Sequence, residues 1–305
     1  MHEGKGKERN KGIMRFTKMQ GCGNDYVYVN GFEEKISARQ KPELVRRLSD
    51  RHFGIGGDGV IFINPSDVAD CEMEMYNADG SRSEMCGNGI RCVAKFVYDK
   101  GIVDRKRFTV VSAGQIKHME LTVEKSENPE DRTYNGGRGV AVKVRVNMGS
   151  PVLVPEQIPV QVSGDKAVDV PITVQDKEYR MTCVSMGNPH AVILAEGVRD
   201  MDLAAIGPDF ENHALFPNRT NTEFVEVIDR NHVFMRVWER GTGETLACGT
   251  GCCATAVACI LAGKTEDKVT VEVLGGELLI EWDRAENNIY MTGPAETVFE
   301  GCVEV

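Results

Sequence analysis

Short segments in which apolar and polar residues alternate run through most of the chain. Because successive side chains of a strand point to opposite faces, alternation with period two predicts β-strands, and Gly, Asn, Asp or Pro residues at the segment ends favour the same structure. The Gly275-Gly276 pair between two such segments predicts a hairpin turn. The strands predicted in this way are 26–30, 60–64, 72–76, 108–111, 141–146, 269–273 and 278–282.

Three segments have the composition of helices. Residues 41–51 are amphipathic and begin beside Pro42, a favourable residue in a first helical turn. Residues 90–100 and 252–262 are apolar or small on most faces, which predicts helices buried inside β structure. The segment 125–139 contains Asn-Pro and Gly-Gly pairs and is expected to form an exposed loop inserted in a hairpin. The chain is therefore expected to be an α+β protein.

One short motif occurs twice, immediately before each of the two apolar helices. Residues 85–89 read Met-Cys-Gly-Asn-Gly, and residues 247–251 read Ala-Cys-Gly-Thr-Gly. An apolar, aromatic strand end precedes each cysteine by nine residues, at Asn77 and at Glu239. This duplication predicts two pseudo-symmetric domains, each a mixed β-sheet or barrel around a central helix. A site formed by both helix starts would lie in the cleft between them.

The duplicated cysteines, Cys86 and Cys248, stand at the predicted helix starts. The first N–H groups of a helix lack intrahelical partners and attract anions, so two converging helix starts suit a substrate carboxylate. The same field is expected to lower the pKa of both thiols, which the flanking glycines should leave exposed. A thiolate on one face of a carbon and a thiol on the other can remove and return a proton, which inverts a stereocentre. The alternative is that both cysteines only pack at glycine-rich turns.

Other polar residues in the sequence allow two interpretations each. His190 follows Asn188-Pro189 after a glycine turn, and it is either a base or substrate ligand, or a structural histidine. Glu239 and Arg240 end an apolar strand, where a buried arginine would suit a carboxylate, although a solvent-facing ion pair is the simpler alternative. Asn24 precedes an aspartate after a glycine-rich segment, where both residue types also favour turns.

Residues 54–59 satisfy the G-x-G-x-x-G pattern of dinucleotide-binding proteins. That pattern needs a strand before it and a helix after it, because the phosphates bind at the helix start. In this chain a predicted helix precedes the pattern and a predicted strand follows it. A structural turn is therefore expected.

Composition and charge narrow the class of partner. The chain has 305 residues and a formal charge of −10, which disfavours nucleic acid and anionic membranes as partners. No apolar run approaches the ~20 residues of a membrane span, and residues 1–13 are expected to be a disordered tail rather than a signal peptide.

The spacing of the cysteines argues against a metal site or a disulfide framework. None of the ten cysteines forms a Cys-x-x-Cys pair, so free thiols in a reducing cytoplasm are expected. Apolar neighbours predict core positions for Cys71, Cys183, Cys259 and Cys302.

Taken together, the motifs resemble the diaminopimelate epimerase family. The resemblance covers essentially the whole chain after the tail, and its most specific block is 239–251. Proline-type racemases share the Cys-Gly-x-Gly motif but would be expected to carry histidine where Asn88 stands. The matching blocks are 18–26, 51–58, 77–81, 84–92, 186–190 and 239–251.

This resemblance implies the interconversion of LL- and meso-diaminopimelate, a step of lysine and peptidoglycan precursor biosynthesis, with neither pyridoxal phosphate nor metal. It implies Cys86 and Cys248 as the paired bases, His190 as a supporting residue, and a domain of 14–147 plus 295–305 against one of 148–294. The substrate-binding residues that it implies are Asn24, Asn77, Gly87, Asn88, Asn188, Asn221, Glu239, Arg240, Gly249 and Thr250.

Two other functions remain open from the sequence. An epimerase of another amino acid would use the same two thiols and differ only in how it recognises the distal end of its substrate. A carboxylate-binding protein without turnover would need the helix N–H groups but not paired cysteines, so the second thiol argues against it. A small-molecule substrate is the expected partner, and the oligomeric state is left open, with a homodimer as one option.

Overall fold

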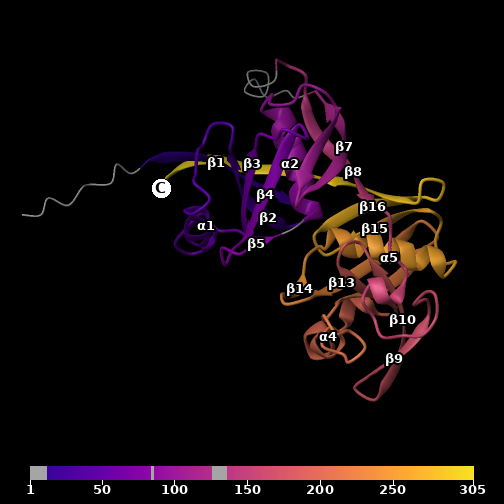
Figure 1. The fold of residues 1–305 in the computed structure, drawn as a ribbon. Helices are drawn as coiled ribbons and strands as arrows, with labels where there is room; N and C mark the ends of the chain where they lie inside the picture. The colour runs from indigo at the N-terminus through magenta and orange to yellow at the C-terminus, as the bar shows by residue number, and fades with distance from the viewer. Residues whose placement is uncertain (1–11, 84–85, 126–135) are drawn as a thin grey trace, which may run out of the picture.

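The computed structural model describes residues 12–83, 86–125 and 136–305, and the chain forms two halves in these ranges (Figure 1). The N-terminal half comprises β1 (Ile13–Gly21), β2 (Asn24–Asn30), α1 (Lys41–Ser49), β3 (Gly59–Asn64), β4 (Cys71–Asn77), β5 (Arg82–Ser83), α2 (Gly87–Asp99), β6 (Arg107–Ser112), β7 (Gln115–Glu124) and β8 (Val140–Gly149).

The C-terminal half repeats this order of elements after an extra short helix and strand. It comprises η1 (Pro155–Gln157), β9 (Val170–Val174), β10 (Lys177–Ser185), β11 (Pro189–Leu194), η2 (Val198–Asp200), α4 (Leu203–Glu211), β12 (Asn221–Asp229), β13 (His232–Glu239), β14 (Gly243–Thr245), α5 (Gly249–Leu261), β15 (Lys268–Val273), β16 (Gly276–Asp283) and β17 (Asn288–Pro294). The last strand is β18 (Glu296–Glu304).

Strand pairing is the same in the two halves. In the N-terminal half, β2 pairs with β3 and β4 pairs with β6 in parallel, while β1–β2, β3–β4, β6–β7 and β7–β8 are antiparallel. In the C-terminal half, β11–β12 and β13–β15 are the parallel pairs, while β10–β11, β12–β13, β15–β16 and β16–β17 are antiparallel. The parallel pairs β2–β3 and β11–β12 need crossover connections, which contain α1 and α4. The predicted pseudo-symmetric α+β architecture is confirmed.

The two central helices, α2 and α5, lie inside this β structure. Every residue of α2 except Asp99 is buried, and every residue of α5 except Thr250 and Leu261. Helix α2 packs on β1, β2, β7 and β8, and α5 packs on β10, β11, β12, β15 and β16. Burial of each large apolar side chain contributes roughly 1.5–3 kcal/mol, so helices that are apolar on most faces are stable only in such surroundings.

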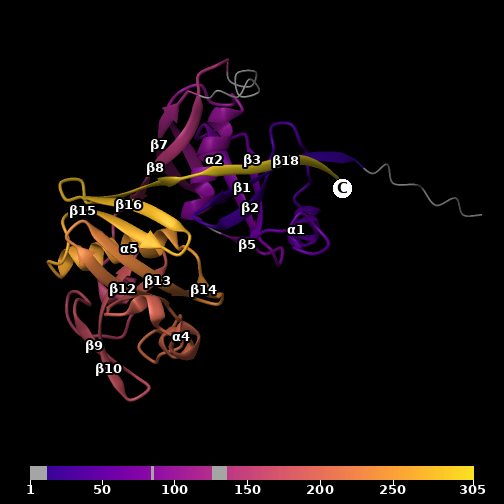
Figure 2. The ribbon, with the colours of Figure 1, turned by 180° about the vertical axis from the view of Figure 1, so that it is seen from behind.

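Two long strands join the halves. Strand β17 pairs antiparallel with β8, and β18 returns from the C-terminal half to pair with β1, as Figure 2 shows for the strand that ends at the C-terminus. The division into 14–147 plus 295–305 and 148–294 remains a proposal, which this pairing of β18 supports. Residues 1–11 of the predicted tail lie outside the described residues, and Ile13 already belongs to β1.

The predicted elements agree with the structure apart from their ends. Each predicted strand and helix is present within a few residues of its expected bounds, and the turn between β15 and β16 falls at Leu274-Gly275, one residue earlier than expected. Helix α4 was not predicted. The loop predicted at 125–139 lies mostly outside the described residues, but the antiparallel β7–β8 pair that flanks it is present.

One prediction about the cysteines is wrong. Cys71, Cys183 and Cys259 are buried, but Cys302 is exposed because it lies on β18, which pairs with β1 and whose residues are largely exposed. None of the helices in the described part of the chain has the length and apolar character that a membrane crossing would require.

The β15–β16 turn fits closely against the β1–β2 turn of the other half. Gly275 donates its N–H to the carbonyl oxygen of Leu246 at 2.9 Å, and a Cβ atom on Gly275 would lie 1.9 Å from the carbonyl oxygen of Cys22. The equivalent turn of the N-terminal half, between β6 and β7, contains Gly114, and a Cβ atom there would meet nothing within 4 Å. The close contact between the halves is therefore made on one side only.

We predict that Gly275→Ala destabilises the protein by about 1–3 kcal/mol, the usual cost of overpacking, because backbone atoms of Cys22 must move. Gly114→Ala is the control, since its φ of +77° gives a conformational cost of roughly 1–2 kcal/mol without a clash. Urea unfolding and the activity of both variants measure the difference. A stability loss smaller than about 1 kcal/mol in the Gly275→Ala variant would contradict the tight contact.

Candidate active site

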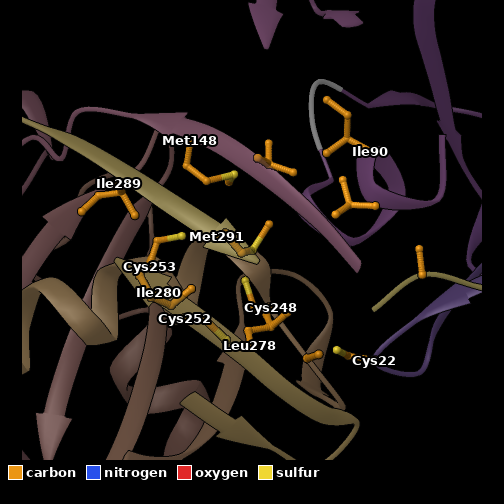
Figure 3. Packing of buried hydrophobic residues seen from close by; sticks show 14 of the residues in the cluster. Cys22, Ile90, Met148, Cys248, Cys252, Cys253, Leu278, Ile280, Ile289 and Met291 are labelled. Carbon is orange, nitrogen blue, oxygen red and sulfur yellow. The ribbon is translucent and has the colours of Figure 1, made fainter. Parts of the chain in front are cut away.

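The first residues of α2 and α5 touch each other. A Cβ atom on Gly249 would lie 3.3 Å from the Cα atom of Gly87 and 3.3 Å from the Sδ atom of Met291, so glycine permits this close approach without a tight contact. Figure 3 shows Cys248 and Met291 in the C-terminal half and Ile90 on α2 of the N-terminal half. The residues just before the two glycines are Cys86 and Cys248, which are therefore neighbours across the seam between the halves.

Both cysteines are the N-cap residues of their helices. Cys86 has φ −130° and ψ 116°, and Cys248 has φ −120° and ψ 110°, so the two backbones enter their helices in nearly the same way. The Gly89 N–H donates to Cys86 Sγ at 3.2 Å, as a side-chain oxygen does in an ordinary N-cap. The duplicated motif thus places two thiols at two converging helix starts, as the sequence predicted.

Asn24 holds the Cys86 thiol from the other side. Cys86 Sγ donates to Asn24 Oδ1 at 3.0 Å, and Asn24 Nδ2 donates to Asp58 Oδ2 at 2.6 Å. Arg51 in turn pairs with Asp58 at 2.9 Å. A chain of polar contacts therefore runs from the surface to the thiol and fixes the orientation of the Asn24 amide.

This chain of contacts gives the 54–59 segment a function that the sequence analysis missed. The segment is a turn between α1 and β3, as expected, and three of its N–H groups bond to the last carbonyl groups of α1. However, its Asp58 also accepts the Asn24 amide and the backbone N–H of Asp25. The sequence signal was the aspartate within the glycine-rich segment.

Cys248 lies in a different electrostatic environment. Its side chain has no capping hydrogen bond within the described residues, and its Sγ atom lies 3.5 Å from Thr250 Oγ1. Burial raises its pKa well above the ordinary thiol value, and the carboxylates of Glu239 and Glu223 raise it further. Burial also raises the pKa of Glu239, against the hydrogen bond that it accepts from Thr245 at 2.5 Å.

The prediction of exposed thiols with lowered pKa values is wrong for both cysteines. Cys86 is only partly exposed and Cys248 is 6% exposed. Burial raises the pKa of Cys86 to about 11, although the N–H groups of Gly89 and Asn88 act in the opposite direction. Desolvation therefore raises the thiol pKa by more than the N–H groups of the helix start lower it.

His190 belongs to a fully buried pair beside Cys248. Its Nδ1 atom lies 2.6 Å from Glu223 Oε1 and its Nε2 atom lies 3.0 Å from Asn188 Oδ1. The side chains of His190 and Glu223 are both 0% exposed, and Glu223 Oε2 is without a hydrogen-bond partner among the described residues. A Cβ atom on Gly251 would lie 2.7 Å from Glu223 Oε1, so the carboxylate reaches the first turn of α5.

The N-terminal half carries uncharged residues at the equivalent positions. In β11–β12, His190 is opposite Asn221, and Glu223 is two residues further along β12. In β2–β3, Val27 is paired with Val60, and this pair corresponds to the one that comes directly after His190 and Asn221 in β11–β12. Tyr26 and Ile61 are therefore the counterparts of His190 and Glu223. A Cβ atom on Gly89 would meet Ile61 Cδ1 at 2.8 Å, in the place where Gly251 meets Glu223.

Asn88 and Asn221 are nearly fully buried residues of the predicted site. Asn88 Nδ2 donates to the carbonyl oxygen of Ala247 at 3.3 Å, which links the two halves, and its Oδ1 is without a partner within the described ranges. Asn221 Nδ2 donates to the Pro189 carbonyl at 2.9 Å, and its Oδ1 accepts the N–H of Arg240 at 2.9 Å. Both amides therefore fix the backbone next to predicted site residues.

Arg240 and Asn77 contact neighbouring loop and hairpin groups. Arg240 is exposed rather than buried, because β13 ends at Glu239, and its Nη1 donates to the Asn218 carbonyl at 3.1 Å. No ion pair of Arg240 is present in the described part of the structure, so neither sequence interpretation of its environment holds. Asn77 Nδ2 donates to Ser81 Oγ at 3.1 Å inside the β4–β5 hairpin.

The described ranges contain no cluster of side chains suited to bind a metal ion. No group of three or more His, Cys, Asp or Glu residues there is arranged to hold a metal ion. The cysteines of the described part are all free thiols. The groups available at the helix starts are therefore thiols, amides, carboxyl groups and backbone N–H groups.

Comparisons with known proteins identify the family of this chain. Residues 16–154 and 182–298 match the model of the family described as diaminopimelate epimerase. Proteins named diaminopimelate epimerase are similar over nearly their whole length. That of Agathobacter rectalis is 51% identical, covering 96% of this chain and 100% of the relative, and that of Desulfovibrio desulfuricans is 54% identical, covering 94% and 97%.

Solved structures with low sequence identity share the fold. A Bacillus anthracis phenazine biosynthesis protein of the PhzF family has a TM-score of 0.66 at 15% identity, and the match covers 96% of this chain and 100% of that one. A hydroxyproline epimerase from Agrobacterium vitis has a TM-score of 0.65 at 14% identity, and the match covers 97% and 94%. The paired N-cap cysteines, the family match and relatives above 50% identity lead to one conclusion: this chain belongs to the diaminopimelate epimerase family.

Proposed function

We propose that this chain interconverts LL- and meso-diaminopimelate by a two-base mechanism that uses Cys86 and Cys248. The observation that carries the proposal is the contact between Gly87 and Gly249, which sets two N-cap thiols on either side of one seam. The family relationship supplies the substrate, and no pyridoxal phosphate or metal takes part in the proposed reaction. We also propose that the residues predicted from the resemblance, from Asn24 to Thr250, bind the substrate.

The proposed step is a balanced exchange of two protons. The thiolate of one cysteine removes the α-proton, so an S–H bond forms, the C–H bond breaks and its electron pair moves into the carboxylate as an enolate. The thiol of the other cysteine then gives its proton to the opposite face of the carbon, which leaves a thiolate there. The N–H groups at both helix starts stabilise the negative charge on the carboxylate.

One thiol must lose its proton before this exchange begins. Glu239 lies close enough to raise the pKa of the Cys248 thiol and has a raised pKa of its own, so it is well suited to take that proton. Asn24, oriented by Asp58, accepts from Cys86 on the other side. We further propose His190 as a supporting residue, action in the cytoplasm, and a homodimer as the assembly.

We predict that Cys86→Ala and Cys248→Ala each abolish inversion of LL-diaminopimelate, because each removes one of the two proton carriers. In deuterated buffer the unaltered chain should incorporate deuterium at one α-carbon only, which mass spectrometry and NMR measure. Cys302→Ala, at an exposed thiol on β18, is the control and should retain full activity. Inversion by either single variant would remove that cysteine from the mechanism, and a panel including proline and hydroxyproline tests the substrate.

We predict that alkylation of Cys86 in the ligand-free protein is slow at pH 7 and rises about tenfold per pH unit up to about 11. The alkylation rate rises with pH because burial favours the neutral thiol. The reactive thiolate accumulates only as the pH approaches the raised pKa. Peptide mass spectrometry after iodoacetamide treatment measures the rate for each cysteine. A plateau for Cys86 below pH 9 would show that the helix start outweighs burial.

We predict that Asp58→Ala lowers kcat by about 10²-fold, the scale of loss that follows when a group at the reacting centre is misplaced by an ångström. Without Asp58, the Asn24 amide loses its 2.6 Å hydrogen bond and can turn its oxygen away from Cys86. Asp67→Ala changes an exposed aspartate of the same half and serves as the control. Unchanged kcat in the folded Asp58 variant would show that Asn24 needs no such support.

A further inference from the structure

Arg91 is the largest fully buried side chain in the described part of the chain, with 0% exposure. It lies in α2, behind the residues that form the helix start. Taking an ion out of water costs several kcal/mol unless an opposite charge compensates it. None of the ion pairs formed by the described residues includes Arg91, so this charge is buried without a carboxylate partner.

The contacts of Arg91 are all with neutral groups. Its Nε donates to the Pro294 carbonyl at 3.0 Å and its Nη1 to the Gly87 carbonyl at 3.1 Å. Its Nη1 also lies 3.7 Å from Met291 Sδ, and its Nη2 lies 3.7 Å from Cys22 Sγ. The hydrogen bonds therefore tie α2 to the end of β17, but they leave the charge itself unbalanced.

The surrounding backbone is built to admit the guanidinium. A Cβ atom on Gly21 would lie 3.1 Å from Arg91 Nη2, and one on Gly293 would lie 3.0 Å from Nε. Both glycines are in strands, β1 and β17, where glycine is otherwise unfavourable. Space for a buried cation is thus made by residues from both of the strands that flank it.

The position of Arg91 relates it to both helix starts at once. The Gly87 carbonyl that it holds belongs to the first residue of α2, and Met291, its other neighbour, lies against Gly249 at the start of α5. In a buried site a charge is poorly screened, so its field adds to that of the unpaired N–H groups. The missing negative charge would be supplied when a carboxylate binds there.

We propose that Arg91 is a positioning residue whose permanent charge, behind the paired helix starts, stabilises the substrate carboxylate and the enolate formed from it. It does not face the reacting carbon. Instead it holds Gly87 against β17 and adds a fixed positive charge that substrate binding and the transition state compensate. This inference rests on the proposed two-thiol epimerisation.

The test compares Arg91→Met, which removes the charge, with Arg91→Lys, which keeps it, and with Arg107→Met as a control at an exposed arginine of β6. Two readouts are measured: kcat and KM for LL-diaminopimelate, and the pH dependence of Cys86 alkylation relative to the exposed Cys302. The methionine variant should lose at least about tenfold in kcat and shift the Cys86 profile to higher pH, where one pKa unit corresponds to tenfold. The lysine variant should keep the profile of the unaltered chain.

Several outcomes would overturn the proposal. One is a folded methionine variant with unchanged kcat and an unchanged alkylation profile. Another is an equal loss in both variants without any shift of the profile, which would make Arg91 structural only. If the methionine variant does not fold, the lysine variant decides, because a shifted profile there contradicts a role for charge. Inactivity of the unaltered chain would instead refute the proposed function, while the alkylation profiles still report on Arg91.

Discussion

Backbone contact between the starts of α2 and α5 is the constraint around which the site is built. Gly87 and Gly249 approach so closely that a Cβ atom on the second would lie 3.3 Å from the Cα atom of the first. Because each cysteine directly precedes its glycine, in nearly the same extended conformation, the placement of both thiols follows from this contact. The glycines at the helix starts are therefore determinants of thiol geometry, as well as sources of exposed N–H groups.

This geometry also affects the protonation of the two thiols, because it buries them. The contact that brings the helix starts together also removes water from the thiols, and burial raises the pKa of Cys86 and of Cys248. The N–H groups of the helix starts oppose this effect without reversing it. Both thiols therefore favour the protonated form in these surroundings.

Local sequence signals predicted the fold class, the two central helices and seven of the strands, because the signals were strong in these regular elements. Other strands, among them β1, β10 and β18, were not predicted. The alternating strands, the two apolar helices and their duplicated cysteines are all present. Helix α4 escaped prediction because it contains Gly207 and Pro208, residues that weaken any helical pattern. Exposure was the least predictable property, since it depends on partners distant in sequence: Cys248 is buried against the other half, whereas Arg240 and Cys302 face solvent.

The polar neighbours of the thiols were predictable only in part for the same reason. Asp58 and Arg91 act on the site through contacts that span 34 or more residues, and no local pattern reports them. Glu223 offered one signal, a lone carboxylate in the otherwise uncharged start of β12, but its partner His190 lies on another strand. The groups that carry out the proposed chemistry were therefore easier to predict from the sequence than the groups that orient them.

Comparison of the two halves shows where their symmetry ends. Duplication has kept the backbone of the helix starts, but the residues below them differ: Ile61 contacts the start of α2, and Glu223 contacts the start of α5. Among the described residues, the carboxylates that raise the pKa values of the two thiols are Glu239 and Glu223, and both belong to the C-terminal half, together with His190. The two thiols therefore lie at equivalent backbone positions but in unequal fields. Under the proposed two-base mechanism, this asymmetry of charge suits two groups that must be in opposite protonation states at the same moment.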